Sequence, residues 1–238
     1  MSREVIRRYH CSCNAIVSAT DTSANDTYYS LQWGFKQANG IDIKMPAAWD
    51  KTQGSQNVVI GIIDTGVDYN HSDLVANMWT NPGEVPGNGI DDDGNGYVDD
   101  VRGYNAITGD GNPFDDNGHG THVAGTIGAV GNNSKGVVGV NWRVKMVPIK
   151  FLTSTGSGDL YDAIKAVDYA TALKRKGVNI IGTNNSWGGG GYSQPLYDAI
   201  ARARDAGLHH RPDPEGGGDG GRYRLHDLAL LRWNQRGH

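Results

Sequence analysis

Apolar and polar residues alternate in blocks along the middle of the chain, and the blocks predict strands and helices in turn. Three segments are predicted as strands: 58–63, 144–149 and 178–181. The first is a continuous apolar run, which is typical of a strand buried on both faces of a sheet. Three segments have the apolar spacing of helices: 120–130, 160–174 and 195–206. The apolar face predicted for the second helix consists of Leu160, Ile164, Val167 and Ala170. This alternation favours an α/β fold with a doubly wound parallel sheet.

The two ends of the chain do not follow this pattern. The first twenty or so residues lack periodicity, and the segment 209–238 becomes rich in Gly, Arg and His where another apolar strand is due. We therefore expect 209–238 to be foreign to the domain, as a shifted or misassigned reading frame would make it. A disordered polar tail is the alternative that the composition also permits.

Composition and charge exclude several classes of partner. The formal net charge is −4 and no basic stripe occurs, so nucleic acid is not an expected partner. No apolar run reaches membrane-spanning length, and the charged segment 1–10 has no apolar core of a signal peptide. Cys11 and Cys13 lie one residue apart, a spacing that suits neither a local disulfide nor a zinc site.

Two residues have the setting of a catalytic pair. Asp64 ends the first apolar run, so the predicted strand delivers its carboxylate to the carboxyl end of the sheet, where ligands bind in such folds. His119 stands among glycines where a polar loop becomes a helix of small residues. An imidazole that removes a proton from a hydroxyl needs a buried carboxylate to fix its tautomer, so these residues predict two members of a nucleophilic triad.

The motifs around this pair resemble those of the subtilisin-like serine proteases (subtilases, peptidase S8). They are Asp-Thr-Gly at 64–66, His-Gly-Thr-His-Val-Ala-Gly-Thr at 119–126 and Asn-Ser-Trp-Gly at 185–188, within a resemblance that covers about 28–208. The resemblance implies a partial peptidase domain at 28–208, in which Asp64 orients the histidine and His119 is the general base. It also implies an extracellular, monomeric endopeptidase that acts on polypeptides, with 1–27 as a propeptide remnant or an unrelated segment, and an inhibitory propeptide as a partner.

The resemblance further implies where the substrate lies. Subtilases hold a peptide as an added strand between two chain segments. The matching residues are Gly156, Ser157, Gly158, Ser186, Trp187 and Gly188. Without the resemblance, both segments read equally well as ordinary glycine-containing loops.

An acidic loop between the two catalytic candidates predicts a calcium site. In 91–100, oxygen-bearing side chains fall at positions 1, 3, 5 and 9 of a loop with glycine at position 6. These side chains are Asp91, Asp93, Asn95 and Asp99. Arg102 replaces the glutamate of a complete EF-hand, so we expect a calcium loop outside that motif, and a solvated turn is the alternative.

The resemblance alone implies a second calcium site. Its ligands would be the side chains of Asp73 and Asn133 and the carbonyl groups of Gly131, Lys135 and Val137.

The third member of the triad is missing from this sequence. No serine follows Ser193, and Asn234, between Trp233 and Gln235, does not have the apolar-to-glycine setting of an oxyanion asparagine. Ser186 and Ser193 lie in the expected substrate region, so neither is expected to be the nucleophile. The sequence thus predicts a subtilase truncated before its serine and inactive as written. The alternatives are a non-catalytic module that binds calcium or peptide, and a metal-dependent hydrolase using His119 and His122.

Overall fold

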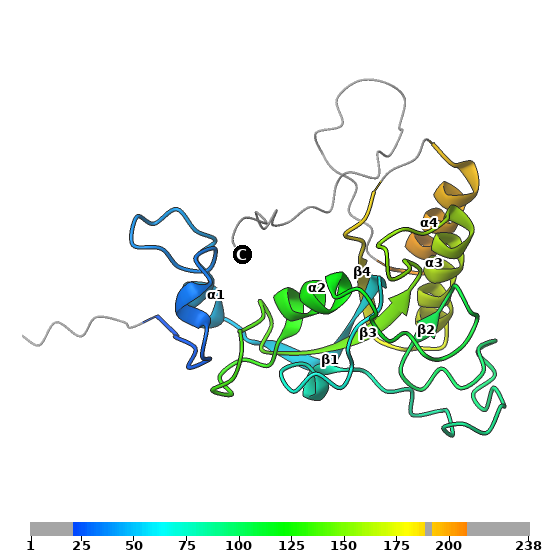
Figure 1. Cartoon of the computed structure of the whole chain (residues 1–238), viewed down its shortest axis with the longest axis horizontal. Helices are drawn as coiled ribbons and strands as arrows, with labels where there is room; N and C mark the ends of the chain where they lie inside the picture. Colours follow the sequence, from blue (N-terminus) through cyan, green and yellow to red (C-terminus); the bar gives the residue numbers. More distant parts are fainter. Residues whose placement is uncertain (1–20, 189–191, 209–238) are drawn as a thin grey trace, which may run out of the picture.

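The computed structural model describes residues 21–188 and 192–208 (Figure 1). The expected change of reading frame at 209–238 lies outside the described residues, as does most of the expected propeptide remnant at 1–27.

A parallel four-stranded sheet forms the centre of the molecule. Its strands are β1 (Gly54–Asp64), β2 (Tyr104–Asn105), β3 (Arg143–Lys150) and β4 (Ile180–Asn184). All pairings are parallel and the order is β2-β3-β1-β4, so the strand that ends in Asp64 lies between β3 and β4. The prediction of a parallel α/β sheet is therefore confirmed. The two-residue strand β2 was not predicted because it is too short to show a pattern.

The three predicted helices are present within one residue at their start. They are α2 (His119–Gly128), α3 (Leu160–Arg175) and α4 (Gln194–Asp205). The carboxylate of Asp159 accepts the Asp162 N–H at the start of α3, and the Ser193 hydroxyl caps α4 in the same way. The predicted face of α3 is wrong in one position. Leu160, the first residue of the helix, is 40% exposed.

Short elements that the pattern did not predict precede or interrupt the main ones. They are the helix α1 (Met45–Trp49) and the 3₁₀ turns η1 (Tyr29–Leu31) and η2 (Val75–Asn77).

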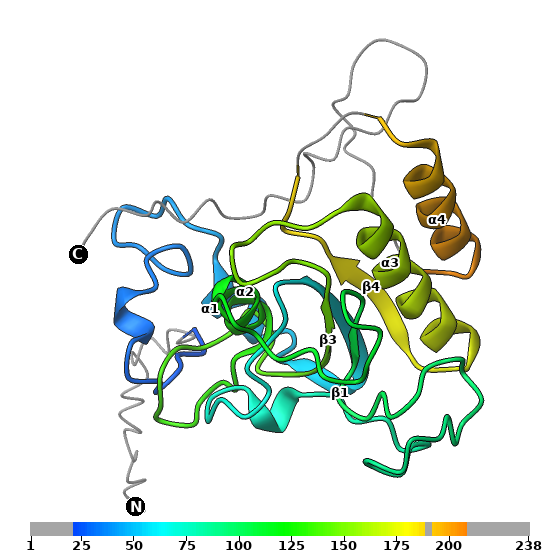
Figure 2. The same ribbon diagram turned by 45° about the vertical axis from the view of Figure 1, so that its right-hand side comes forward.

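Helices cover both faces of the sheet (Figures 1 and 2). Successive residues of a strand point to opposite faces. Ile62 accordingly belongs to the same buried cluster as Ala124 of α2, and Ile63 to the same buried cluster as Val167 of α3. Both isoleucines are fully buried. The helices α3 and α4 lie side by side on one face, and α2 lies on the other. Burial on both sides is the physical reason for the continuous apolar run of β1.

The N-terminal part forms a third, smaller core away from α3 and α4 (Figure 2). The Trp49 ring packs edge-on against Phe35 and Trp142, with ring centroids 5.6 and 5.2 Å apart. Trp142 immediately precedes β3, so this core attaches residues 24–49 to the start of the sheet, opposite to the end that bears Asp64.

Candidate active site

Asp64 and His119 meet at the carboxyl end of the sheet. Asp64 is the last residue of β1 and is fully buried, and His119 is the first residue of α2. The imidazole Nδ1 lies 2.7 Å from the Asp64 carboxylate Oδ1. The histidine side chain is 49% exposed, so its ring has one edge on the aspartate and another toward solvent. The pair can therefore orient an imidazole that removes a proton from an external group.

The electrostatic setting of Asp64 reflects its burial. Burial raises the pKa of the Asp64 carboxyl above its usual value, against the hydrogen bonds from His119 and from the Thr65 backbone N–H, which lower it. The second oxygen, Oδ2, is buried without a hydrogen-bond partner among the described residues. Burial of this carboxylate therefore costs free energy of folding, and its hydrogen bond to His119 orients the imidazole.

A second buried aspartate holds the start of α2 against the turn after Asp64. The Asp115 carboxylate accepts hydrogen bonds from the hydroxyl groups of Thr65 and Thr121 and from the backbone N–H groups of Asn117, Gly118 and Thr121. Burial raises the pKa of Asp115, but these hydrogen bonds outweigh it and leave the pKa below its usual value. Asp115 therefore takes the place of a helix cap, because the residue that precedes the helix is Gly118.

Two glycines permit the close approach of the turn and the helix. A Cβ on Gly120 would lie 2.0 Å from the carbonyl oxygen of Gly66 and 3.2 Å from the Asp64 Cβ. Gly66 itself has φ +104°, and a Cβ there would lie 2.5 Å from the Pro113 carbonyl oxygen. The expectation that glycines bring the backbone close to the pair has its physical reason here.

The expected substrate residues lie at the same end of the sheet, on either side of β1. Residues 156–158 belong to the loop between β3 and α3, and residues 186–188 follow β4. The loop is a tight turn, with the Gly156 N–H bonded to the Thr153 carbonyl and Gly156 at φ +75°. Residues 156–158 are exposed, whereas Ser186 and Trp187 are half-buried.

Trp187, in the segment after β4, packs against the start of the β3–α3 loop, which carries the other expected substrate segment. Its ring packs against Phe151 at the start of the β3–α3 loop, with centroids 4.7 Å apart and planes at 63°. It also packs against the core between the sheet and α3. The indole of Trp187 therefore supports the position of both segments.

An acidic cluster lies in the long loop between β1 and β2. Carboxylate oxygens of Glu84, Asp93 and Asp100 all lie within 4.8 Å of one another, which makes the cluster a group that could hold a metal ion. The amide of Asn81 donates to Asp93 Oδ2 at 2.9 Å and to Asp100 Oδ1 at 2.8 Å. Asp93 Oδ1 is buried and has no partner in the described part of the chain. Burial, with a smaller contribution from Asp93, raises the pKa of Asp100.

The four calcium ligands predicted in the loop 91–100 do not all lie in the acidic cluster. Only Asp93 belongs to the cluster. Asp91 accepts the N–H groups of Asn95 and Gly96, while Asp99 accepts those of Gly87 and Gly89. The Asn95 amide donates to Asp93 and to Asp100, so it adjoins the cluster. Sequence reasoning missed Glu84, which precedes the loop, and Asp100, which falls at position 10 of the loop, where the EF-hand motif has no ligand.

Two of the four other residues of the second expected calcium site, Asn133 and Val137, contact Asp73. The Asn133 amide donates to Asp73 Oδ1 at 2.7 Å, and the Val137 N–H donates to Oδ2 at 3.0 Å. Asp26, which sequence reasoning missed, lies at the same loop and accepts the N–H groups of Asn132 and Asn133. Burial raises the pKa of Asp26, and the Asp73 charge adds a smaller increase.

No metal-ligand group in the described ranges contains the two histidines of α2. His119 is bound to Asp64 through Nδ1, and His122 is exposed.

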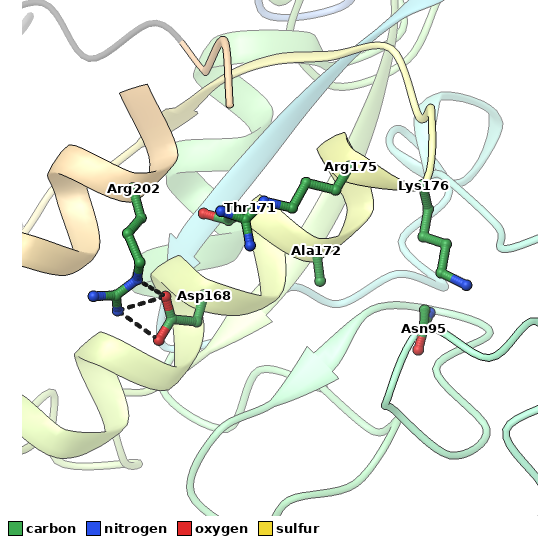
Figure 3. Close-up of a pocket in the computed structure, with 7 residues that line it drawn as sticks. All are labelled: Asn95, Asp168, Thr171, Ala172, Arg175, Lys176 and Arg202. Carbon is green, nitrogen blue, oxygen red and sulfur yellow. Dashed lines mark hydrogen bonds and ion pairs between the residues drawn. The ribbon is translucent and has the colours of Figure 1, made fainter. Parts of the chain in front are cut away.

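A separate open cleft of about 460 Å³ lies between α3, α4 and the acidic loop (Figure 3). Figure 3 shows Arg202 held by the Asp168 carboxylate, with Nη2–oxygen distances of 2.8 and 3.0 Å. The cleft extends to Arg175 and Lys176 at the end of α3, a helix of 16 residues and hence about 24 Å long. Because the loop at the other end of α3 adjoins the Asp64–His119 pair, this cleft is distinct from the candidate active site.

A buried aspartate at a strand end and a histidine at a helix start, on a parallel α/β sheet, form the arrangement by which triad-type hydrolases orient a general base. The sequence model of the Subtilase family (peptidase S8) matches residues 55–211. The chain therefore belongs to the subtilase family.

Several similar proteins are proteases by name, and one of them is named as subtilisin-like. Subtilisin-like protease 1 of Plasmodium berghei is 44% identical over 158 residues, which cover 66% of this chain and 25% of the relative. The Extracellular protease of Xanthomonas campestris is 38% identical over 205 residues, covering 81% of this chain and 34% of the relative. A solved protease structure from Pseudoalteromonas arctica matches with a TM-score of 0.60 and 28% identity, over 79% of this chain and 57% of that one. The chain thus spans about a quarter to a third of the curated relatives' length.

Proposed function

We propose that the chain is the Asp- and His-bearing part of a subtilisin-like serine endopeptidase that acts on polypeptides. Asp64 fixes the tautomer and orientation of the imidazole, and His119 is the general base toward a serine hydroxyl that these 238 residues do not supply. The single observation that carries the proposal is the 2.7 Å contact between His119 Nδ1 and the fully buried Asp64. It leaves the exposed edge of the ring available to a nucleophile.

A hybrid protein tests the role of this pair. The segment after Leu208 is replaced by the serine-bearing part of a relative such as the Thermophilic serine proteinase of Bacillus sp., which is 36% identical over 157 residues. We expect the hybrid to be labelled by a fluorophosphonate probe, and the label to be lost in His119→Ala and Asp64→Ala. Labelling that survives both substitutions would contradict the proposal.

For the chain as it stands, we propose that it is catalytically inactive. No serine follows Ser193 in the sequence, so covalent catalysis lacks its nucleophile. The same absence supports the alternative of a non-catalytic module that binds peptide or calcium. Incubation of the 238-residue chain with casein and with the fluorophosphonate probe tests this directly. Specific labelling of any residue would overturn it, whereas peptide binding without cleavage favours the module.

We further propose that the acidic cluster binds calcium. The partnerless, buried oxygen of Asp93 and three carboxylates in one place are what a hard cation with oxygen ligands requires. Glu84, Asp93 and Asp100 would hold the ion, with Asn81 and Asn95 adjacent. Bound calcium would supply positive charge to a loop that has little secondary structure, and so would stabilise it.

The site around Asp73 is proposed as a second calcium site. Asp73, Asn133 and the loop that bears the expected carbonyl ligands lie together, and Asp26 adds a second carboxylate that the resemblance did not suggest.

Two further proposals concern the C-terminal segment and the location of the enzyme. We propose that 209–238 arise from a shifted reading frame, which is supported by a family match that ends at residue 211. Resequencing the DNA at codons 205–215 tests this, since confirmed DNA in the present frame would refute it. We also propose an extracellular enzyme, because one relative is named Extracellular protease. The proposal of an inhibitory propeptide rests on the family resemblance alone. Among the described residues no helix is long and apolar enough to cross a membrane.

A further inference from the structure

Lys150, the last residue of β3, carries a buried ammonium group that the catalytic scheme does not use. Its side chain is 6% exposed. The Nζ atom donates to the Thr65 carbonyl at 2.6 Å, to Asp116 Oδ1 at 2.7 Å and to the Leu152 carbonyl at 2.9 Å. An ammonium group has three protons, so each one has an acceptor.

The three acceptors belong to three different segments of the candidate active site. Thr65 follows Asp64 at the end of β1, and Asp116 lies in the loop that leads to His119. Leu152 is the second residue of the β3–α3 loop. Next to the ammonium, the Asp64 carbonyl accepts the Phe151 and Leu152 N–H groups at 3.0 and 3.2 Å. Lys150 is also the register partner of Asp64 in the sheet.

A buried ammonium is stable only while its charge is paired and its protons are bound. Movement of the turn after Asp64, of the loop before His119 or of the β3–α3 loop would therefore leave a buried charge partly unsatisfied. The free-energy cost of losing these hydrogen bonds therefore restrains the three segments in their relative positions.

We propose that Lys150 is a positioning residue that fixes the β3–α3 loop relative to the Asp64–His119 pair. The inference depends on the proposed function in one respect, because it treats residues 156–158 of that loop as the substrate segment. In this role Lys150 aligns a bound peptide with the general base, without touching the reacting atoms.

Asn117 makes a second link between the same partners, this time at the surface. Its Oδ1 accepts the His119 backbone N–H at 3.1 Å, and its Nδ2 donates to the Ser154 carbonyl of the β3–α3 loop at 2.8 Å. Asn117 is exposed, so it can be replaced without opening the core. The loop is thus connected to the pair through one buried and one exposed side chain.

The test compares Lys150→Met with Lys145→Met in the full 238-residue chain. Lys145 is a matched control on the same strand, because its Nζ also binds two carbonyl groups, those of Ala76 and Met78 at 2.9 and 3.1 Å. It lies toward the opposite end of β3 from the site. NMR follows the downfield Nδ1 proton of His119, assigned by its loss in His119→Gln, and hydrogen exchange of the Phe151 and Leu152 amides.

We expect Lys150→Met to shift or broaden the His119 proton and to speed exchange of both amides by at least about tenfold. Lys145→Met should lower the melting temperature while leaving the His119 proton and these amides unchanged. Lys150→Arg should restore the resonance in part, since it keeps the charge. A folded Lys150→Met variant with the native His119 signal and native exchange would overturn the proposal.

Asn117→Ala keeps the proposal testable if Lys150→Met does not fold. We expect it to speed amide exchange in the β3–α3 loop and to perturb the His119 proton at an unchanged melting temperature. If Asn117→Ala and a folded Lys150→Gln, which removes the charge, both leave these signals native, the proposal is wrong.

A labelled extended peptide separates this inference from the proposed function. The native chain should bind the peptide, and Lys150→Arg and Asn117→Ala should bind it several-fold more weakly. A native chain that binds no peptide contradicts the proposed substrate segment, while the NMR comparison still decides on Lys150.

Discussion

The hydroxyl group of Thr65 donates to the Asp115 carboxylate at 2.8 Å and accepts the Gly120 backbone N–H at 2.9 Å. This residue therefore joins the turn after Asp64 to the first turn of the helix that begins with His119. The distance between the two catalytic candidates is consequently set by a buried network, and not only by their own 2.7 Å contact.

Replacement of Asp115 by Asn should cost about 2 kcal/mol of unfolding free energy at pH 7, because charge-assisted hydrogen bonds from two hydroxyls and three N–H groups are lost. The folded-state pKa of Asp115 lies below its usual value of 3.8. Its contribution is therefore complete above that value and is lost as the pH falls through the lower, folded-state pKa. Urea unfolding from pH 7 down to pH 2 measures both effects.

The exposed Asp205 provides the control for a change of charge alone, since within the described ranges its carboxylate forms an ion pair with its neighbour Arg204 at the surface. Asp205→Asn should leave the unfolding free energy nearly unchanged. An Asp115→Asn variant as stable as native at pH 7 would contradict the network.

Much of this site was predictable from sequence, and the part that was not has a physical reason. Asp64 and His119 stand out because each lies at the boundary of a periodic element, where residue type and position can be read together. Lys150 and Glu84 act through contacts between separate segments, and Asp115 joins the residues that follow it to Thr65, which is distant in sequence. Asp115 alone left a signal, an acidic residue shortly before a helix that lacks its own cap.

The burial of Asp64 predicts a conflict between stability and function. Burial raises its pKa, so the ionised carboxylate costs stability above the folded-state pKa and the penalty disappears below the unfolded value near 3.8. Asp64→Asn should thus be as stable as the native chain or more stable by about 1 kcal/mol at pH 8, with no gain at pH 3. Thermal unfolding at the two pH values measures this difference.

In the serine-bearing hybrid, the same Asp64→Asn substitution should lower the turnover rate by about 10⁴-fold, because the amide no longer holds the required imidazole tautomer. Turnover within tenfold of the native hybrid would show that Asp64 does not orient the base.

Calcium should raise the melting temperature of the chain, and the acidic cluster should account for part of that rise. At a calcium concentration about 100 times the dissociation constant, one site contributes about 2.7 kcal/mol. Glu84→Gln and Asp93→Asn should reduce the calcium-dependent rise, and melting curves in calcium and in chelator measure it.

Two neighbouring aspartates, Asp92 and Asp91, provide controls for this experiment. Asp92 is exposed and bonded to Val85 N–H and to the Asn88 amide, so Asp92→Asn is a matched control that should keep the rise. Asp91→Asn distinguishes the two ligand sets, because Asp91 belongs to the sequence-predicted set and not to the cluster. A loss with Asp91→Asn and none with Glu84→Gln would favour the sequence-predicted set.

Two glycines of the same helix should respond in opposite ways to an added methyl group. At Gly120 a Cβ would lie 2.0 Å from the Gly66 carbonyl, so Gly120→Ala must move α2 away from β1 and should cost roughly 2–3 kcal/mol. At Gly125 a Cβ would meet no atom within 4 Å among the described residues, so Gly125→Ala should gain up to about 1 kcal/mol from helix propensity. Urea unfolding of both variants gives these values, and the His119 Nδ1 proton should be perturbed only in Gly120→Ala. Equal effects of the two substitutions would mean that the close approach at Gly120 does not set the position of the helix.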